Sequence, residues 1–219
     1  MKHLVIFDVD GTLIDSQDHI VAAMTGAFGA VGLPLPPRAA LLGIVGLSLP
    51  QAMAALVPDQ PLETQLALVD AYKASFMGLS VTDHAQLYPG ARAVLDRLAA
   101  GGSITLAVAT GKSRRGLDRM VTALGLDGYF ATMQVADDHP SKPNPSMILA
   151  CLRDTGITAE RAVMVGDTSF DRDMARAAGV GFIGVSWGYH ATDTLGPRVI
   201  EHFGALPGAL EQLWGLELA

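Results

Sequence analysis

The sequence Leu-Val-Ile-Phe-Asp-Val-Asp-Gly-Thr at residues 4–12 places four apolar side chains directly before two aspartates and a glycine. Other short apolar runs, rich in Val and Ile, also stop at polar or glycine-rich turns. They span residues 104–109, 162–165 and 182–185, with a weaker run at 132–135 and a candidate late edge strand at 199–203. Runs of this length that alternate with helical segments are typical of buried strands in a parallel sheet.

The segments between these runs have the periodicity of amphipathic helices. In residues 91–100, Val94, Leu95 and Leu98 share one face, and glycines follow at once. Three further helices are predicted, at residues 115–124, 146–152 and 171–178. Strands that alternate with helices of this length predict an α/β fold with a doubly wound, Rossmann-like parallel sheet.

The alternation is interrupted once. Roughly 75 residues of helical character, without a convincing strand, lie between the first strand and the helix at 91–100, far more than a crossover connection needs. We therefore expect an all-helical cap subdomain at residues 15–86, with Ser16 near a helix N-cap. It would be inserted into an α/β core domain formed by residues 1–14 and 87–219.

Composition excludes several classes of partner. Of 219 residues, 50% are apolar, and 22 acidic against 15 basic side chains give a net charge of −7. This balance argues against nucleic acid and against an anionic membrane surface. The single cysteine, Cys151, cannot form an internal disulfide, which favours a cytoplasmic setting. We expect a monomer or a homodimer.

Two segments need a check against membrane or targeting functions. Asp8 and Asp10 interrupt the N-terminal apolar run too early for a signal peptide. Residues 20–58 carry one charge, Arg38, but four prolines and few large aliphatic side chains argue against a membrane span. Two buried helices explain this stretch better.

Three motifs follow the ends of predicted strands, where ligands bind in open α/β sheets. The first contains Asp8 and Asp10, which in an extended segment project to the same side about 6.5–7 Å apart. That spacing can hold a divalent cation and a phosphoryl group. Solvated turn residues would produce the same pattern, so this motif alone does not decide between a site and a turn.

The second motif contains Thr110, Gly111 and Lys112, where a hydroxyl and free backbone N–H groups can form a small anion cradle. An ordinary helix start with Ser113 as N-cap explains it equally well.

Another motif, at residues 141–145, lies between strands, and its prolines would fix the backbone and aim the Lys142 ammonium.

The last motif contains Asp167, directly after a predicted buried strand, and Asp171, in the first turn of the next helix. Carboxylates suit Mg²⁺ as hard oxygen ligands. Acidic residues at a helix N-terminus also stabilise the helix without any ligand.

A Gly-x-Gly-x-x-Gly match at 179–184 follows a helix and enters a strand, the wrong order for dinucleotide binding.

In this order and placement, the four motifs resemble the haloacid dehalogenase superfamily, and most closely its phosphoglycolate phosphatase-like branch with a helical cap. The agreement covers the predicted core, whereas the inserted segment matches only in being helical. It extends through residues 13–16, 88–90, 107–113 and 141–145.

The resemblance implies a Mg²⁺-dependent phosphatase that acts on a small phosphate monoester. Asp8 would be the nucleophile that forms an aspartyl-phosphate, and Asp10 would protonate the leaving oxygen and then activate water. Lys142 would hold Asp8 and the phosphate charge together. Thr110, Gly111 and Lys112 would bind the substrate, and Mg²⁺ would be held by Asp8, the backbone carbonyl of Asp10 and Asp167, with Asp171 in or near that shell.

Several alternatives share these features. The same core residues would serve a hexose phosphate phosphomutase or a nucleotide or sugar phosphatase. A receiver domain or an inactive binding homologue would not release phosphate. The insertion offers only Arg38 and Lys73 as cations, so recognition of the glycolate carboxylate stays open. Asp10 favours phosphoryl transfer, because relatives that cleave carbon–halogen bonds lack the second aspartate.

Overall fold

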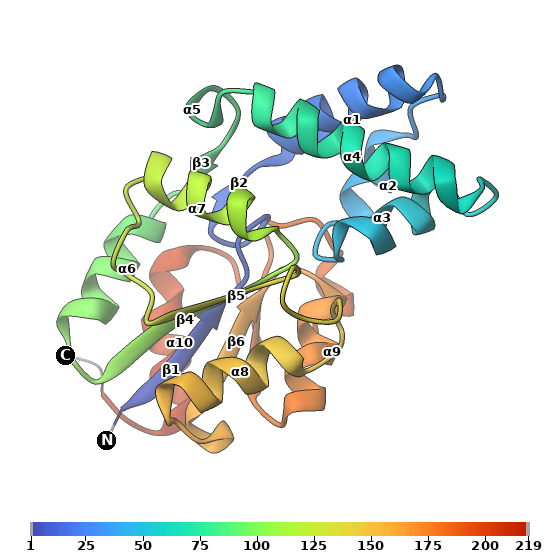
Figure 1. Ribbon diagram of the computed structural model, residues 1–219. Helices are drawn as coiled ribbons and strands as arrows, with labels where there is room; N and C mark the ends of the chain where they lie inside the picture. Colours follow the sequence, from blue (N-terminus) through green and yellow to red (C-terminus); the bar gives the residue numbers. More distant parts are fainter. Residues whose placement is uncertain (1, 218–219) are drawn as a thin grey trace.

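A six-stranded sheet forms the centre of the computed structural model, which describes residues 2–217 apart from the side chain of His84. The strand order is β5-β4-β1-β6-β7-β8, and every neighbouring pair is parallel. Figure 1 labels the first four of these strands. The strands are β1 (His3–Phe7), β4 (Ile104–Thr110), β5 (Thr132–Val135), β6 (Ala162–Gly166), β7 (Gly181–Val185) and β8 (Val199–Ile200). The predicted doubly wound α/β sheet is confirmed.

Helices cover both faces of this sheet (Figure 1). Alternating side chains of β1 point to opposite faces, so Val5 and Phe7 join one apolar core while Leu4 and Ile6 join another. The first core is covered by α6 (Ala91–Ala100), α7 (Arg114–Ala123) and α10 (Leu206–Trp214), and the second by α8 (Ser146–Thr155) and α9 (Ser169–Ala178).

The last strand is shorter than expected. Residues 199–203 were a candidate edge strand, but β8 ends at Ile200. A 3₁₀ turn begins at Phe203, whose buried ring packs against Trp187 with centroids 4.9 Å apart. The turn directs the chain into α10 and so ends the pairing. The glycines that match the dinucleotide-binding pattern have structural positions instead. Gly179 caps the C-terminus of α9 and Gly181 begins β7, in agreement with the order of helix and strand predicted from the sequence.

Five helices lie between β1 and α6 and form a helical insertion beside the sheet (Figure 1). Many of its apolar side chains form a core of their own, while Ala23, Phe76, Val81 and Ala85 join the first core of the sheet. A short antiparallel pair, β2 (Ile14–Asp15) with β3 (Gln86–Leu87), joins the chain where it enters and leaves. The helices are α1 (Gln17–Val31), α2 (Arg38–Gly43), α3 (Leu49–Leu56), α4 (Leu62–Gly78) and α5 (Val81–His84).

The expectation of two helices in residues 20–58 was wrong, because the structure has three there. Residues 44–48 form a loop between α2 and α3. This loop turns toward the sheet and makes contacts that are described below. Within residues 2–217, no helix has both the length and the apolar character required to cross a bilayer.

The packing of α6 on the sheet predicts the effect of a core truncation. Leu95 is fully buried in α6, whereas Leu149 in α8 is 46% exposed. We expect Leu95→Ala to lower the free energy of unfolding by about 2–5 kcal/mol, since it leaves a cavity. Leu149→Ala, the matched control, should change it by less than about 0.5 kcal/mol. Urea unfolding followed by circular dichroism measures both, and equal losses would contradict this assignment of the core.

Candidate active site

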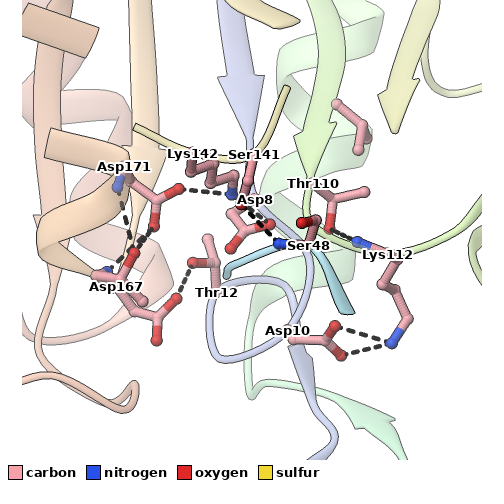
Figure 2. A network of polar contacts seen from close by, with 12 residues as sticks. Asp8, Asp10, Thr12, Ser48, Thr110, Lys112, Ser141, Lys142, Asp167 and Asp171 are labelled. Atoms are coloured by element: carbon pink, nitrogen blue, oxygen red, sulfur yellow. Dashed lines mark hydrogen bonds and ion pairs between the residues drawn. The ribbon is translucent and has the colours of Figure 1, made fainter. Parts of the chain in front are cut away.

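The carboxyl ends of three adjacent strands meet at one edge of the sheet. β1, β4 and β6 are neighbours and run parallel, so the residues at their ends lie close together. Figure 2 shows Asp8 after β1, Thr110 at the end of β4 and Asp167 after β6 around one centre. The structure thus brings together motifs that are far apart in the sequence.

Asp167 is held in place by the loops around it. Thr12 Oγ1 donates a hydrogen bond to Asp167 Oδ1 at 2.8 Å, and the Tyr189 backbone N–H donates to Oδ2 at 2.9 Å. Gly11 has a φ of +78°, and a Cβ atom there would lie 2.3 Å from Asp167 Oδ2. Only glycine satisfies both conditions, which explains the glycine after Asp10.

Three buried carboxylates lie close together, and a single ammonium group pairs with two of them. Oxygen atoms of Asp8, Asp167 and Asp171 all lie within 4.8 Å of one another. Lys142 Nζ lies 3.0 Å from Asp8 Oδ1 and 2.7 Å from Asp171 Oδ1 (Figure 2). All four side chains are buried. The cluster therefore holds more negative than positive charge in a place that water does not screen.

This crowding shifts the proton affinities of the cluster. Burial raises the pKa of Asp8 to about 7; the Asp171 and Asp10 charges add to the effect, and the Lys142 ammonium opposes it. Burial also raises the pKa of Asp167 well above its usual range, again with help from neighbouring carboxylates. Burial alone would lower the pKa of Lys142, but Asp171 and Asp8 outweigh burial and raise it.

The cluster fits a divalent cation. In the described part of the chain, the Lys142 ammonium, 3.0 Å from Oδ1, is the one partner of the Asp8 carboxylate, and Oδ2 has none. A buried carboxylate with so few donors is costly, and a hard cation such as Mg²⁺ would satisfy its oxygens. Asp171 is less free: Oδ2 accepts from the Thr168 hydroxyl at 2.6 Å, in the capping box of α9, and Oδ1 binds Lys142.

Asp10 has a different set of partners, and its carboxylate lies outside the cluster. Lys112 Nζ donates to both Asp10 oxygens, at 2.9 and 2.8 Å (Figure 2). The Ser16 hydroxyl also donates to Asp10 Oδ1. Ser16 does occupy the N-cap of α1, but its side chain makes no cap hydrogen bond. The predicted helix start at Asp15 and Ser16 is confirmed, but the Ser16 hydroxyl binds Asp10 instead of capping the helix.

The backbone after β4 lies against the helical insertion. A Cβ atom on Gly111 would lie 2.5 Å from the carbonyl oxygen of Gly46 and 2.6 Å from that of Leu47. Next to this contact, the Ser48 N–H donates to Ser141 Oγ at 2.7 Å. Thr110 Oγ1 accepts a weak hydrogen bond from the Lys112 N–H at 3.3 Å. The loop between α2 and α3 thus covers two of the predicted motifs.

A cavity of about 590 Å³ lies between this loop and the strand ends. Asp8, Asp10 and Thr110 line it from the sheet, and Lys73 lines it from the insertion. Arg38, the other cation of the insertion, lies at the surface in an ion pair with Asp18 at 3.1 Å. The insertion also contributes a largely apolar wall, formed by Ile20, Met24, Val45, Leu49, Phe76 and Met77.

Some residues of the site were missed in the sequence. Thr12 was quoted within the first motif without a role, and Ser16 was assigned only to a helix cap. Tyr189 had no predicted role, although its loop follows β7. The rule that ligands gather beyond strand ends points to this loop as well, so applying it to every predicted strand was the signal available.

Comparison with known proteins agrees with the geometry. The family model described as "Haloacid dehalogenase-like hydrolase" matches residues 5–185. "Probable phosphatase IndB" of Dickeya dadantii (strain 3937) is 38% identical, over 97% of this chain and 95% of the relative. A phosphoglycolate phosphatase of Pseudomonas putida is 32% identical, over 100% and 84%.

The fold also matches a solved structure. The crystal structure described as a predicted phosphoglycolate phosphatase from Haemophilus somnus 129pt has a TM-score of 0.84 at 22% identity, covering 94% of this chain and 96% of that one. At this identity, the likeness shows the fold. The family match and the curated relatives show more: the chain is a phosphatase-type enzyme that belongs to the haloacid dehalogenase-like hydrolases, in the branch similar to phosphoglycolate phosphatases.

Proposed function

We propose that this protein is a Mg²⁺-dependent phosphatase that hydrolyses a small, phosphoglycolate-like phosphate monoester through an aspartyl-phosphate on Asp8. The observation that carries the proposal is the Asp8 carboxylate itself. It is buried at the cavity, pairs with the Lys142 ammonium through Oδ1, and has no partner for Oδ2 within residues 2–217. An oxygen without a donor keeps its lone pairs available for attack.

In the first half of the reaction, an Asp8 oxygen attacks phosphorus and the bond from phosphorus to the ester oxygen breaks. Asp10, also at the cavity, would give its proton to that leaving oxygen. Thr110 and the Gly111 backbone would bind the phosphoryl oxygens. Lys142, 3.0 Å from Asp8, would reduce the repulsion between the carboxylate and the phosphate charge.

In the second half, Asp10 is a carboxylate and takes a proton from water. The water oxygen attacks phosphorus, the bond between phosphorus and the Asp8 oxygen breaks, and inorganic phosphate leaves. The two halves return both aspartates to their starting protonation states. One side chain acting first as acid and then as base explains why Asp10 is needed beside Asp8.

The residues that would hold Mg²⁺ are Asp8, Asp167 and the backbone carbonyl of Asp10, with Asp171 in or near the shell. When bound, the ion would supply the positive charge that offsets repulsion between the Asp8 carboxylate and the phosphoryl group. This assignment is supported by the spacing of the three carboxylates and by the raised pKa of Asp8.

The division into a core domain and a cap at residues 15–86 is part of the same proposal. The insertion would close over the substrate and exclude water, hinged near residues 15–16 and 86–89. The contact of Ser48 with Ser141 and the approach of Gly46 to Gly111 support this function. A cytoplasmic monomer or homodimer completes the proposal.

Removing the nucleophile tests the mechanism. The wild-type protein should release p-nitrophenol from p-nitrophenyl phosphate with Mg²⁺ and not with EDTA. Asp8→Asn should lower kcat by at least about 10³-fold, because asparagine cannot form the aspartyl-phosphate. Circular dichroism should show an unchanged fold. Full activity in a folded Asp8→Asn variant would refute the covalent mechanism.

The metal assignment predicts a different change. Asp167→Asn should raise the Mg²⁺ concentration for half-maximal activity by about 10–100-fold, since a ligand loses its charge. Asp173→Asn is the matched control, because Asp173, in the following helix α9, is not one of the clustered carboxylates and pairs with Arg172 and Arg176. A Mg²⁺ titration of activity compares the two variants. Equal shifts in both would exclude Asp167 as a specific ligand.

The two cations of the insertion test the substrate class. Lys73 lines the cavity and is the insertion's candidate partner for a glycolate carboxylate, whereas Arg38 lies elsewhere. Lys73→Met should raise KM for phosphoglycolate about two- to fivefold and leave KM for p-nitrophenyl phosphate unchanged. Arg38→Met should change neither. If phosphoglycolate turns over more slowly than hexose phosphates or nucleotides in a phosphate-release screen, the substrate assignment is wrong while the phosphatase assignment stands.

A further inference from the structure

We propose that Lys112 is a positioning residue for Asp10 rather than a ligand of the phosphate, and that Phe76 makes this positioning depend on the helical insertion. The proposal rests on the proposed function, in which Asp10 is the acid and base. It changes the role predicted for Lys112 from the sequence and adds a side chain of α4 to the working parts of the site.

The first observation is how completely Asp10 is held. Lys112 Nζ binds both of its carboxylate oxygens, at 2.9 and 2.8 Å, and the Ser16 hydroxyl donates to one of them. Both charged side chains are at least nine-tenths buried. Two oxygens held at once fix the plane of the carboxylate as well as its direction, and a buried ion pair of this kind is poorly screened.

The second observation is that the Lys112 ammonium, although it lines the cavity, is directed to Asp10 and not to Asp8. An ammonium has three donor hydrogens, and two short contacts go to Asp10. Nζ also lies 4.9 Å from the centroid of the Phe76 ring, in a cation–π arrangement. The ammonium that lies against Asp8 is that of Lys142. Figure 2 shows Asp10 directed toward Lys112, on the other side of Asp8 from Asp171.

The third observation is where Phe76 comes from. It lies in the last turn of α4, in the helical insertion, and its ring centroid is 4.3 Å from that of His19 in α1. Arg119 of α7 donates to the carbonyl oxygens of Phe76 and Met77, at 3.0 and 3.1 Å. α7 begins at Arg114, two residues after Lys112. The segment that carries Lys112 therefore also binds the backbone at Phe76, through Arg119.

These contacts connect the insertion to proton transfer. Asp10 can exchange a proton with a leaving oxygen or a water only within hydrogen-bond reach and in a suitable direction. Lys112 and Ser16 set that direction; Phe76 and Ser16 both belong to the chain of the insertion. A shift of the insertion would therefore weaken the Ser16 contact to Asp10 and move the Phe76 ring away from Lys112. Asp10 is fully held only when the insertion is in the place seen here.

A double-mutant cycle tests whether Lys112 acts through Asp10. Lys112→Met removes the charge and keeps much of the volume. It should lower kcat for p-nitrophenyl phosphate at saturating Mg²⁺ by about tenfold and change KM by less than about twofold, since acid–base catalysis contributes about 10²–10⁴ in total. In an Asp10→Asn background the same substitution should have no further effect on kcat. Lys112→Arg, which can bind a carboxylate with two donors, should retain more activity than Lys112→Met.

Two results would overturn the role of Lys112: a rise in KM with kcat preserved, as expected of a phosphate ligand, or the same loss of kcat in both backgrounds. Lys112→Gln replaces Lys112→Met in the cycle if the latter does not fold. An active Asp8→Asn variant would instead overturn the proposed function itself, so the two failures can be told apart.

A second cycle tests the link to the insertion. Phe76→Leu should lower kcat about two- to fivefold, the size of a partly buried cation–π contact, and should have no effect when Lys112 is already methionine. Phe28→Leu is the matched control, because Phe28 is fully buried in the insertion's own core. Its effect on kcat should be the same in both backgrounds. If Phe76→Leu also acts equally in both, the dependence on the insertion is refuted.

Discussion

The site depends on one electrostatic constraint: three carboxylates and one ammonium are buried together where β1 and β6 end. Removing an isolated charge from water costs several kcal/mol even after relaxation. The Lys142 ammonium offsets part of that cost, and burial still raises the pKa of Asp8 to about 7. The raised pKa shows that ionising all three carboxylates beside one ammonium is costly, and a divalent cation would offset that cost. Without such a cation, the ionised carboxylates would repel a phosphate ester.

Hydrogen bonds from neighbouring loops and from a helix start hold two of these carboxylates in place. Thr12 and the Tyr189 backbone hold Asp167, and the helix start at Thr168 holds Asp171. Glycine at position 11 lets the first loop approach a carboxylate that a side chain would displace. None of these residues needs to touch a substrate. Their hydrogen bonds fix carboxylates in a place where apolar side chains would stabilise the fold more, which is a usual property of catalytic sites.

The sheet and the order of the motifs could be predicted from the sequence, because apolar runs that end in polar turns report strand ends directly. Strand β5 was predicted with its observed bounds, and the convergence of Asp8, Thr110 and Asp167 follows from parallel pairing alone. Side-chain partners could not be predicted in this way. Ser16 has the residue type and position of a helix cap, and only the folded chain shows that its hydroxyl binds Asp10. Lys112 lies in a turn of the type that binds phosphate, yet its side chain donates to the Asp10 carboxylate.

The chain has only four lysines, and the two that are buried each pair with a different aspartate of the first motif. Because the net charge is −7, the overall field would not attract an anionic substrate, so local cations must do so. Lys142 lies beside Asp8, the proposed nucleophile, among carboxylates fixed by the sheet. Lys112 lies beside Asp10, the proposed acid and base, against an aromatic ring from the insertion. Within residues 2–217, Asp8 thus has partners from the core alone, whereas Asp10 is held by Lys112 of the core and by Ser16 at the start of the insertion.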